Sequence, residues 1–133
     1  MDRRALLFGT GALIIAVGFG AFGAHAMKTR LTPEALAQWK TAVEYQFYHG
    51  LGLVFLAALS QHLPAKRVRA VRSLFLVGIL LFCGSIYLLS TRELFHLQGW
   101  TSFLGPMTPV GGLLFIAGWF VLFITAIQQR AGD

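Results

Sequence analysis

Charged side chains are scarce in this sequence of 133 residues, where Asp, Glu, Lys and Arg together make up only 12%. A soluble domain carries about twice that share, and hydrophobic residues here reach 56%. The chain therefore lacks the polar surface that a soluble enzyme of this size requires. It is also too apolar to be intrinsically disordered. The composition indicates an integral membrane protein, and the length allows one domain covering residues 1–133.

Cysteine is nearly absent as well, since Cys83 is the only one. A single cysteine excludes an intrachain disulfide and any metal site of the CxxC type. Because Cys83 lies inside an apolar run, we expect it to be a small buried hydrophobic residue. We predict no bound metal and no cofactor.

Acidic residues are few, and eleven Lys and Arg against five Asp and Glu give a net charge of +6. In a soluble protein this balance would suggest a nucleic-acid partner. Here the basic residues form short clusters between apolar runs, so we expect them to orient the chain and to contact lipid phosphates. Membrane lipids are the expected partners and nucleic acid is not. The sequence leaves a homo-oligomer open and identifies no protein partner.

Four apolar runs are long enough to cross a bilayer, at about residues 5–27, 45–63, 73–91 and 108–128. A helix needs about 20 apolar residues to span the hydrocarbon, and only helices or closed barrels satisfy the backbone in lipid. Strand-like alternation is absent. We therefore predict an all-α polytopic membrane protein with four transmembrane helices.

The first run imitates a secretory signal, because basic residues precede it and Ala24-His25-Ala26 matches an A-x-A cleavage site. The apolar region of such a signal has about 7–15 residues, and residues 5–27 exceed that length. We expect this run to be retained as a transmembrane helix.

The segment 32–44 before the second run is amphipathic. Thr32 can cap a helix whose first residue is Pro33, and one face of it is apolar, with Leu36, Trp39 and Val43. We expect this segment to lie at the membrane interface, with Trp39 at headgroup depth. The alternative is one long tilted helix over residues 33–62.

Basic residues are distributed unequally between the two ends of the predicted helices. Seven belong to the termini and the 64–72 connection, and four belong to the opposite side. Since the more basic side of a membrane protein faces the cytoplasm, we predict that both termini are cytoplasmic. The first group is Arg3, Arg4, Lys66, Arg67, Arg69, Arg72 and Arg130, and the second is Lys28, Arg30, Lys40 and Arg92.

Small residues recur at steps of three and four in the first run and return in the fourth. No hydrophobic force joins helices in lipid, so their packing depends on close backbone approach over small residues. We expect these faces to pack against other helices of the same chain, and a dimer seam is the alternative. The residues are Gly9, Ala12, Ala16, Gly20, Gly23, Gly111, Gly112 and Gly118.

Residues 18–23 also match the G-x-G-x-x-G fingerprint of dinucleotide-binding proteins. That fingerprint works only between a strand and a helix of a βαβ unit. Within an apolar helix these glycines are packing positions.

Residues 105–112 combine two prolines with paired glycines. We expect Thr108 to cap the fourth helix and Pro109 to occupy its first turn. The alternative is a broken helix lining a substrate site, as in transporters. Four helices without a visible inverted repeat disfavour that alternative.

Polar residues in three of the predicted helices approach the same outer side of the membrane. Polar groups are costly in lipid, so each requires a partner or a role. We expect an interhelical hydrogen-bond network; a metal site or proton relay is the alternative, although no HxxxH or HxxE spacing occurs. The candidate cluster is His25, Glu44, Gln46, His49, Ser85 and Tyr87.

Four motifs follow one another along the chain: GAFGAH at 20–25, the stretch 39–49 with Tyr45-Gln46 and His49, FCGSIY at 82–87, and 108–119 beginning TPVGG. Their order and spacing resemble the small bacterial inner-membrane proteins of domain of unknown function 423 (YgdD-like or YwdK-like), over essentially the whole chain. Transmembrane protein 256 of animals is similar at a greater distance. Cys83 stands where relatives are expected to carry serine, which argues against cysteine chemistry. The resemblance implies a polytopic inner-membrane protein and no known reaction.

We therefore expect a non-enzymatic accessory, scaffold or small-ligand-binding membrane protein with its polar cluster on the outer side. The alternative is a subunit of a small transporter or channel, in which oligomerisation builds a path through the cluster. A membrane enzyme or metal-binding protein ranks third, because no Ser/His/Asp set, phosphate loop or paired-carboxylate site is recognisable. A dry interior bonded within itself would favour the first function, and a continuous polar cavity would favour the second.

Overall fold

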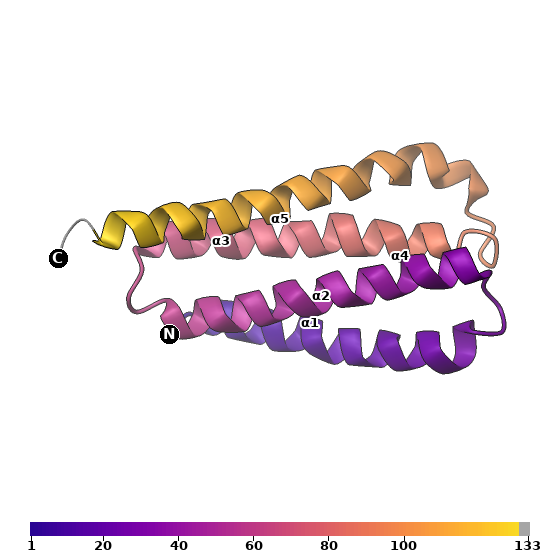
Figure 1. Cartoon of the computed structure of the whole chain (residues 1–133), viewed down its shortest axis with the longest axis horizontal. Helices are drawn as coiled ribbons and strands as arrows, with labels where there is room; N and C mark the ends of the chain where they lie inside the picture. The colour runs from indigo at the N-terminus through magenta and orange to yellow at the C-terminus, as the bar shows by residue number, and fades with distance from the viewer. Residues whose placement is uncertain (131–133) are drawn as a thin grey trace.

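A computed structural model describes residues 1–130, where four antiparallel helical rods form a bundle (Figure 1). The first rod is α1 (Arg3–Phe22), continued by the π-helical turn η1 (Gly23–Met27), and the second is α2 (Pro33–Leu59). The third rod joins α3 (Ala65–Gly78), the π-helical turn η2 (Ile79–Cys83) and α4 (Gly84–Ser90). A short 3₁₀ turn, η3 (Gln98–Trp100), leads into the fourth rod, α5 (Thr101–Arg130).

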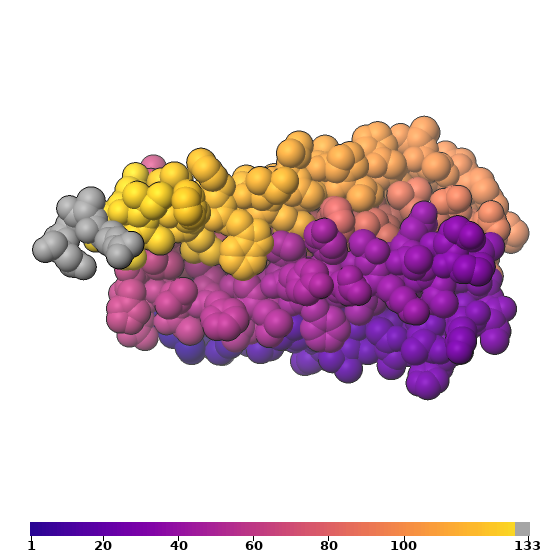
Figure 2. All heavy atoms as spheres, in the orientation of Figure 1, coloured from indigo at the N-terminus to yellow at the C-terminus, as the bar shows by residue number. Residues whose placement is uncertain are grey.

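The rods pack as two hairpins joined through α2. α1 packs chiefly on α2, while α5 packs on α3, η2 and α4. α2 also contacts α3, η2 and α4, whereas α1 and α3 scarcely touch each other. Figure 2 shows α2 crossing one face of the molecule between α1 and α5. α2 contributes ten buried residues, and it is the element that holds the two hairpins together.

The second rod is one uninterrupted helix, which decides between the two alternatives that the sequence left open. The Thr32 side chain accepts a hydrogen bond from the backbone N–H of Ala35 at 3.2 Å, and Pro33 begins the helix, as predicted. Trp39 and Val43 are buried. The Trp39 ring packs inside the bundle, against Phe19 and Tyr87.

Three of the rods, Arg3–Met27, Ala65–Ser90 and Gln98–Gln129, are long and apolar enough to cross a membrane. Their outer surfaces expose large hydrophobic side chains, among them Ile14 at 73%, Leu80 at 71% and Ile116 at 66%. Such exposure is typical of a lipid-facing surface and would be an aggregation hazard in water. α2 is not among the three: its Gln46 and His49 are buried in the bundle, while its charged residues Glu34, Lys40 and Glu44 are exposed.

Two helices begin earlier than predicted. α3 begins at Ala65 and α5 at Thr101, so both Pro106 and Pro109 lie inside α5 and Thr108 is not a cap. Each proline removes one backbone hydrogen bond and crowds the carbonyl four residues before it. Membrane helices tolerate this because neighbouring helices and side chains satisfy the freed groups. Toward this end α5 diverges from α4 (Figure 1).

The N-terminus, the 60–64 connection and the end of α5 lie at one end of the bundle, and the 28–32 and 91–97 connections lie at the other (Figure 1). We call the first of these the basic end, since it carries Arg3, Arg4, Lys66, Arg67, Arg69 and Arg72. The side chain of Arg130, which the sequence assigned to the same side, lies outside the described part of the chain.

Candidate functional site

Gln46 lies in the interior of the bundle, 4% exposed, and its amide links three rods. Its Nε2 donates to the backbone carbonyl of Ala12 in α1 at 2.9 Å. Its Oε1 accepts a hydrogen bond from the hydroxyl of Tyr87 in α4, also at 2.9 Å. Two members of the predicted cluster therefore meet, and their bond joins α2 to α4.

Tyr87 is enclosed by two aromatic side chains. Its ring centroid lies 4.7 Å from that of Trp39 and 4.8 Å from that of Phe19. The indole N–H of Trp39 donates to the backbone carbonyl of Phe19 at 2.8 Å. A Cβ on Gly23 would lie 2.6 Å from the Trp39 indole, so this position accepts only glycine while the indole keeps its place.

His49 is held by hydrogen bonds to both ring nitrogens. Nδ1 lies 2.8 Å from the backbone carbonyl of Tyr45, and Nε2 lies 3.1 Å from Nε1 of Trp119 in α5. A carbonyl can only accept and an indole N–H can only donate. These partners require the neutral histidine with its proton on Nδ1. The ring also stacks on Phe115, with 3.4 Å between centroids and 9° between planes.

Ser85 makes a third polar link, between α4 and α5. Its hydroxyl donates to the backbone carbonyl of Phe82 at 3.0 Å and lies 2.6 Å from the hydroxyl of Thr108. Because Ser85 has one proton to donate, Thr108 is the donor in the second bond. Thr108 therefore acts in helix association and not as the predicted helix cap.

The structure brings only some of the six candidate residues together. His25 in η1 and Glu44 in α2 are exposed, and no hydrogen bond among the described residues joins either one to the other four. The physical reason is that residues 33–44 continue directly into the second rod: His49 lies sixteen residues beyond Pro33, or about 24 Å along the helix, well inside the bundle. His25 instead lies near the end of the first rod.

The described part of the chain contains no candidate metal centre. No group of three or more His, Cys, Asp or Glu side chains is close enough to hold a metal ion there. The Cys83 thiol is buried and free, in the position of a small hydrophobic residue.

Two hydrogen-bond partners of the buried polar side chains were not predicted from the sequence. Trp119 packs against Gly52, and its indole N–H also bonds to His49. Thr108 was assigned to a helix end. A tryptophan deep in an apolar run needs an acceptor for its N–H, and that requirement was the available signal.

The small residues singled out in the sequence lie where helices approach one another. A Cβ on Gly9 would lie 2.9 Å from the backbone oxygen of Gly50, and one on Gly20 would lie 3.5 Å from Val43. Ala16 is fully buried and Ala12 lends its carbonyl to Gln46. In α5, Gly111 and Gly112 lie against Phe82, and Gly118 lies against Phe75. These contacts are all within one chain.

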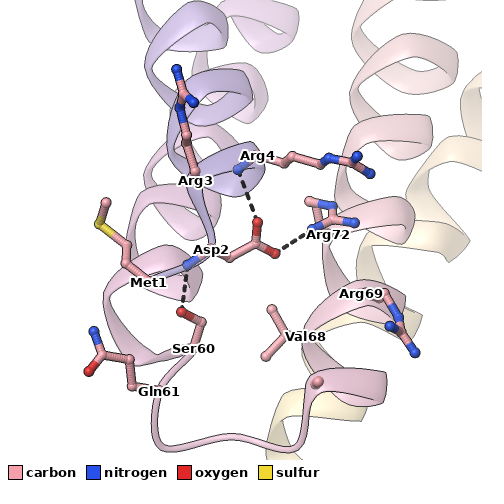
Figure 3. Close-up of a pocket in the computed structure, with 10 residues that line it drawn as sticks. Met1, Asp2, Arg3, Arg4, Ser60, Gln61, Val68, Arg69 and Arg72 are labelled. Carbon is pink, nitrogen blue, oxygen red and sulfur yellow. Dashed lines mark hydrogen bonds and ion pairs between the residues drawn. The ribbon is translucent and has the colours of Figure 1, made fainter.

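A second candidate site opens at the basic end, between α1 and α3 (Figure 3). It is an open cavity of about 460 Å³, and four of its lining side chains are arginines. The lining residues are Met1, Asp2, Arg3, Arg4, Ser60, Gln61, Ala65, Val68, Arg69 and Arg72.

Asp2 connects the helices that surround this cavity. One carboxylate oxygen caps α1, accepting from the backbone N–H groups of Arg4 at 3.0 Å and Ala5 at 3.1 Å, and the other pairs with Arg72 of α3. The backbone N–H of Asp2 donates to the Ser60 hydroxyl at the end of α2, at 2.7 Å. Burial raises the pKa of Asp2, but the Ala5 hydrogen bond and the Arg72 charge together outweigh it, so the pKa lies below its ordinary value. Asp2 is therefore ionised at neutral pH and joins three rods.

Comparisons with known proteins agree with a membrane bundle. The family described as "Protein of unknown function (DUF423)" matches residues 19–112. The UPF0382 membrane protein YwdK of Bacillus subtilis (strain 168) is 36% identical over 124 residues, covering 92% of this chain and 95% of the relative. The UPF0382 membrane protein SSP2132 of Staphylococcus saprophyticus is 38% identical over 119 residues, covering 90% and 92%. No solved structure matches the chain.

Proposed function

Because this chain belongs to the DUF423 family, whose relatives are named membrane proteins, we propose that it is a non-enzymatic accessory or scaffold protein of the bacterial inner membrane. The observation that carries this proposal is the pairing of the interior polar groups. Every buried side-chain nitrogen and oxygen in the described residues has a hydrogen-bond partner. Gln46 bonds to α1 and α4, His49 bonds to Trp119 of α5, and Ser85 of α4 bonds to Thr108 of α5.

A substrate path or an active site needs polar groups that are free to exchange partners during function. Here the Tyr87 hydroxyl bonds to Gln46, and the His49 ring is held by Tyr45 and Trp119. These interior hydrogen bonds therefore fix the positions of the helices relative to one another. Exposed apolar faces and the basic end remain for contact with lipids or partners.

We also propose that all four rods cross the membrane and that both termini are cytoplasmic. The first rod ends at the 28–32 connection and the third begins after the 60–64 connection, at the opposite end of the bundle. If the first and third rods cross, α2 must cross between them. No Asp, Glu, Lys or Arg occurs between Glu44 and Lys66, a stretch of the length that a crossing requires.

We expect a fluorescent protein fused after Asp133 to fluoresce and alkaline phosphatase fused at the same place to be inactive. The reason is the excess of Lys and Arg at the basic end, which retains that end in the cytoplasm. Phosphatase inserted in the 91–97 connection should be active. The opposite pattern in both reporters would overturn the orientation, and equal activity at both sites would overturn the four crossings.

Replacing Gln46 with Leu or Tyr87 with Phe should each destabilise the bundle by about 1 kcal/mol, because each change leaves its partner unpaired in the interior. The double variant should cost less than the sum, with a coupling of about 0.6 kcal/mol, the mean for such bonds in membranes, and at most about 1.7 kcal/mol. Unfolding in mixed detergent micelles measures the cycle. Tyr48→Phe is the matched control, since Tyr48 is 55% exposed.

The same variants distinguish a scaffold from a transporter subunit. Vesicles containing the wild-type protein and a pH-sensitive dye should show no more proton flux than vesicles without protein. Flux that the Gln46→Leu/Tyr87→Phe variant abolishes while remaining folded would contradict the scaffold proposal and support the transporter alternative.

A further inference from the structure

We propose that the groove between α1 and α3 binds one anionic phospholipid, with its phosphate among the arginines of the basic end and an acyl chain along the bundle. This inference rests on the proposed crossing of the membrane, and it assigns a ligand to a surface that the scaffold role leaves open. Two cavities along the first and third rods carry it, one charged at the basic end and one apolar farther along.

The groove exists because α1 and α3 both pack on α2 but scarcely touch each other. At the basic end their only described ion pair is that between Asp2 and Arg72. Figure 3 shows the opening between the two helices, with Arg4 extending across it from α1 and Arg72 of α3 pointing toward Asp2. A ligand entering here meets both helices at once.

The net positive charge of the opening favours an anionic ligand. Four arginines line it against one aspartate, and Arg3, Arg4 and Arg69 are exposed. Asp2 is already engaged by Arg72 and by the N-terminus of α1, which leaves the excess charge on the other arginines. Guanidinium groups bind phosphate oxygens through paired hydrogen bonds, which suits a phosphodiester better than a single point charge would.

Farther from the basic end, the first and third rods line a second, open cavity of about 390 Å³, with Gln46 of α2 at its floor. Its walls are apolar apart from Gln46, whose polar atoms are bonded elsewhere. Phe8 lies one turn beyond Arg4 on α1, and Leu76 lies one turn beyond Arg72 on α3. The lining residues are Leu7, Phe8, Gly11, Ala12, Ile15, Gln46, Leu76, Ile79 and Leu80.

The two cavities together have the length of one lipid leaflet. From Arg4 to Ile15 the helix rises about 16 Å, roughly half of the ~30 Å hydrocarbon thickness. A phosphate at the arginines would therefore place an acyl chain along the apolar cavity. Basic pockets between helices at the cytoplasmic surface suit anionic head groups.

Gly11 offers a way to close the apolar cavity without disturbing the fold. A Cβ at Gly11 meets nothing within 4 Å, and the residue lines the cavity. A Cβ at Gly18, on the same helix, also meets nothing, but Gly18 lies outside the cavity lining. Gly11→Phe and Gly18→Phe are thus a matched pair.

The test measures lipid binding to the full chain in detergent micelles by native mass spectrometry, where membrane orientation has no influence. Long-chain phosphatidylglycerol should bind at least tenfold more tightly than phosphatidylcholine of the same chains. Arg4→Gln with Arg69→Gln should weaken it ten- to thirtyfold, as expected for two head-group contacts. Lys28→Gln with Arg30→Gln, an equal charge change at the other end, should leave it unchanged.

Gly11→Phe should weaken binding of long-chain phosphatidylglycerol about tenfold but leave its dihexanoyl form unaffected, and Gly18→Phe should change neither. Equal binding of phosphatidylcholine would mean unselective lipid contact and overturn the proposal. Inorganic phosphate competing fully, with no effect of Gly11→Phe, would mean an anion site without a lipid and would also overturn it. Correct reporter topology together with no selective binding would reject the lipid site and leave the four crossings intact.

Discussion

Replacing Gly111 with alanine is expected to destabilise the bundle by about 2–3 kcal/mol, in the upper part of the range for overpacked interiors. A Cβ at this position would lie 2.8 Å from the Cα of Phe82, in the backbone of η2. Backbone cannot rotate away as a side chain can. α5 would therefore have to withdraw from the third rod, loosening the Ser85–Thr108 bond beside it.

Gly112→Ala is the control for this prediction. A Cβ there would meet the Phe82 ring at 3.6 Å, an ordinary van der Waals contact. Thermal unfolding in detergent should place Gly112→Ala close to wild type and Gly111→Ala well below it. Equal midpoints for the two variants would show that α5 and η2 do not approach as closely as the structure has them.

Replacing Phe75 with alanine is expected to cost about 3 kcal/mol, at the lower end of the range for buried aromatic side chains. Phe75 is fully buried in α3 and its ring lies 4.9 Å from Trp119 and 5.2 Å from His49. The lower end applies because the unfolded chain also lies in an apolar medium, so lost packing counts more than hydrophobic transfer. Leu80→Ala, on the exposed outer surface, should change stability little.

A second substitution tests whether the Phe75 ring fills the space over Gly118. A Cβ on Gly118 would lie 2.5 Å from the Phe75 ring in the wild type, and without that ring its nearest neighbour is Leu74 at 3.5 Å. Gly118→Ala should therefore destabilise the wild type and be neutral or stabilising in the Phe75→Ala background. Additive effects, measured by the same unfolding experiment, would exclude this direct contact.

In this bundle, helices approach one another closely at glycines, and aromatic rings fill the remaining space. Phe75 fits between Gly52 and Gly118, and Phe115 lies over Gly78. In lipid, this contact and a few hydrogen bonds are what hold helices together.

The polar cluster shows how far sequence reasoning reaches. Gln46 and Tyr87 were both placed in the candidate cluster, and in the structure they bond to each other. His25 and His49 were placed in it too, but His25 lies near the end of the first rod and His49 lies inside the bundle. The start of α2 at Pro33 was predicted; what the sequence left open was whether residues 33–44 lie along the interface or continue the helix into the bundle.

By itself the sequence determined that this chain is a helical membrane protein with one basic end, since apolar length and charge count do not depend on which helices become neighbours. The tertiary structure alone decided that Trp119 bonds to His49, that Thr108 bonds to Ser85, and that arginines from two helices line one cavity. Such contacts join residues far apart along the chain. Which residues come into contact depends on the rotation and the depth of each helix. The periodicity of the sequence leaves both of these undefined by a turn or more.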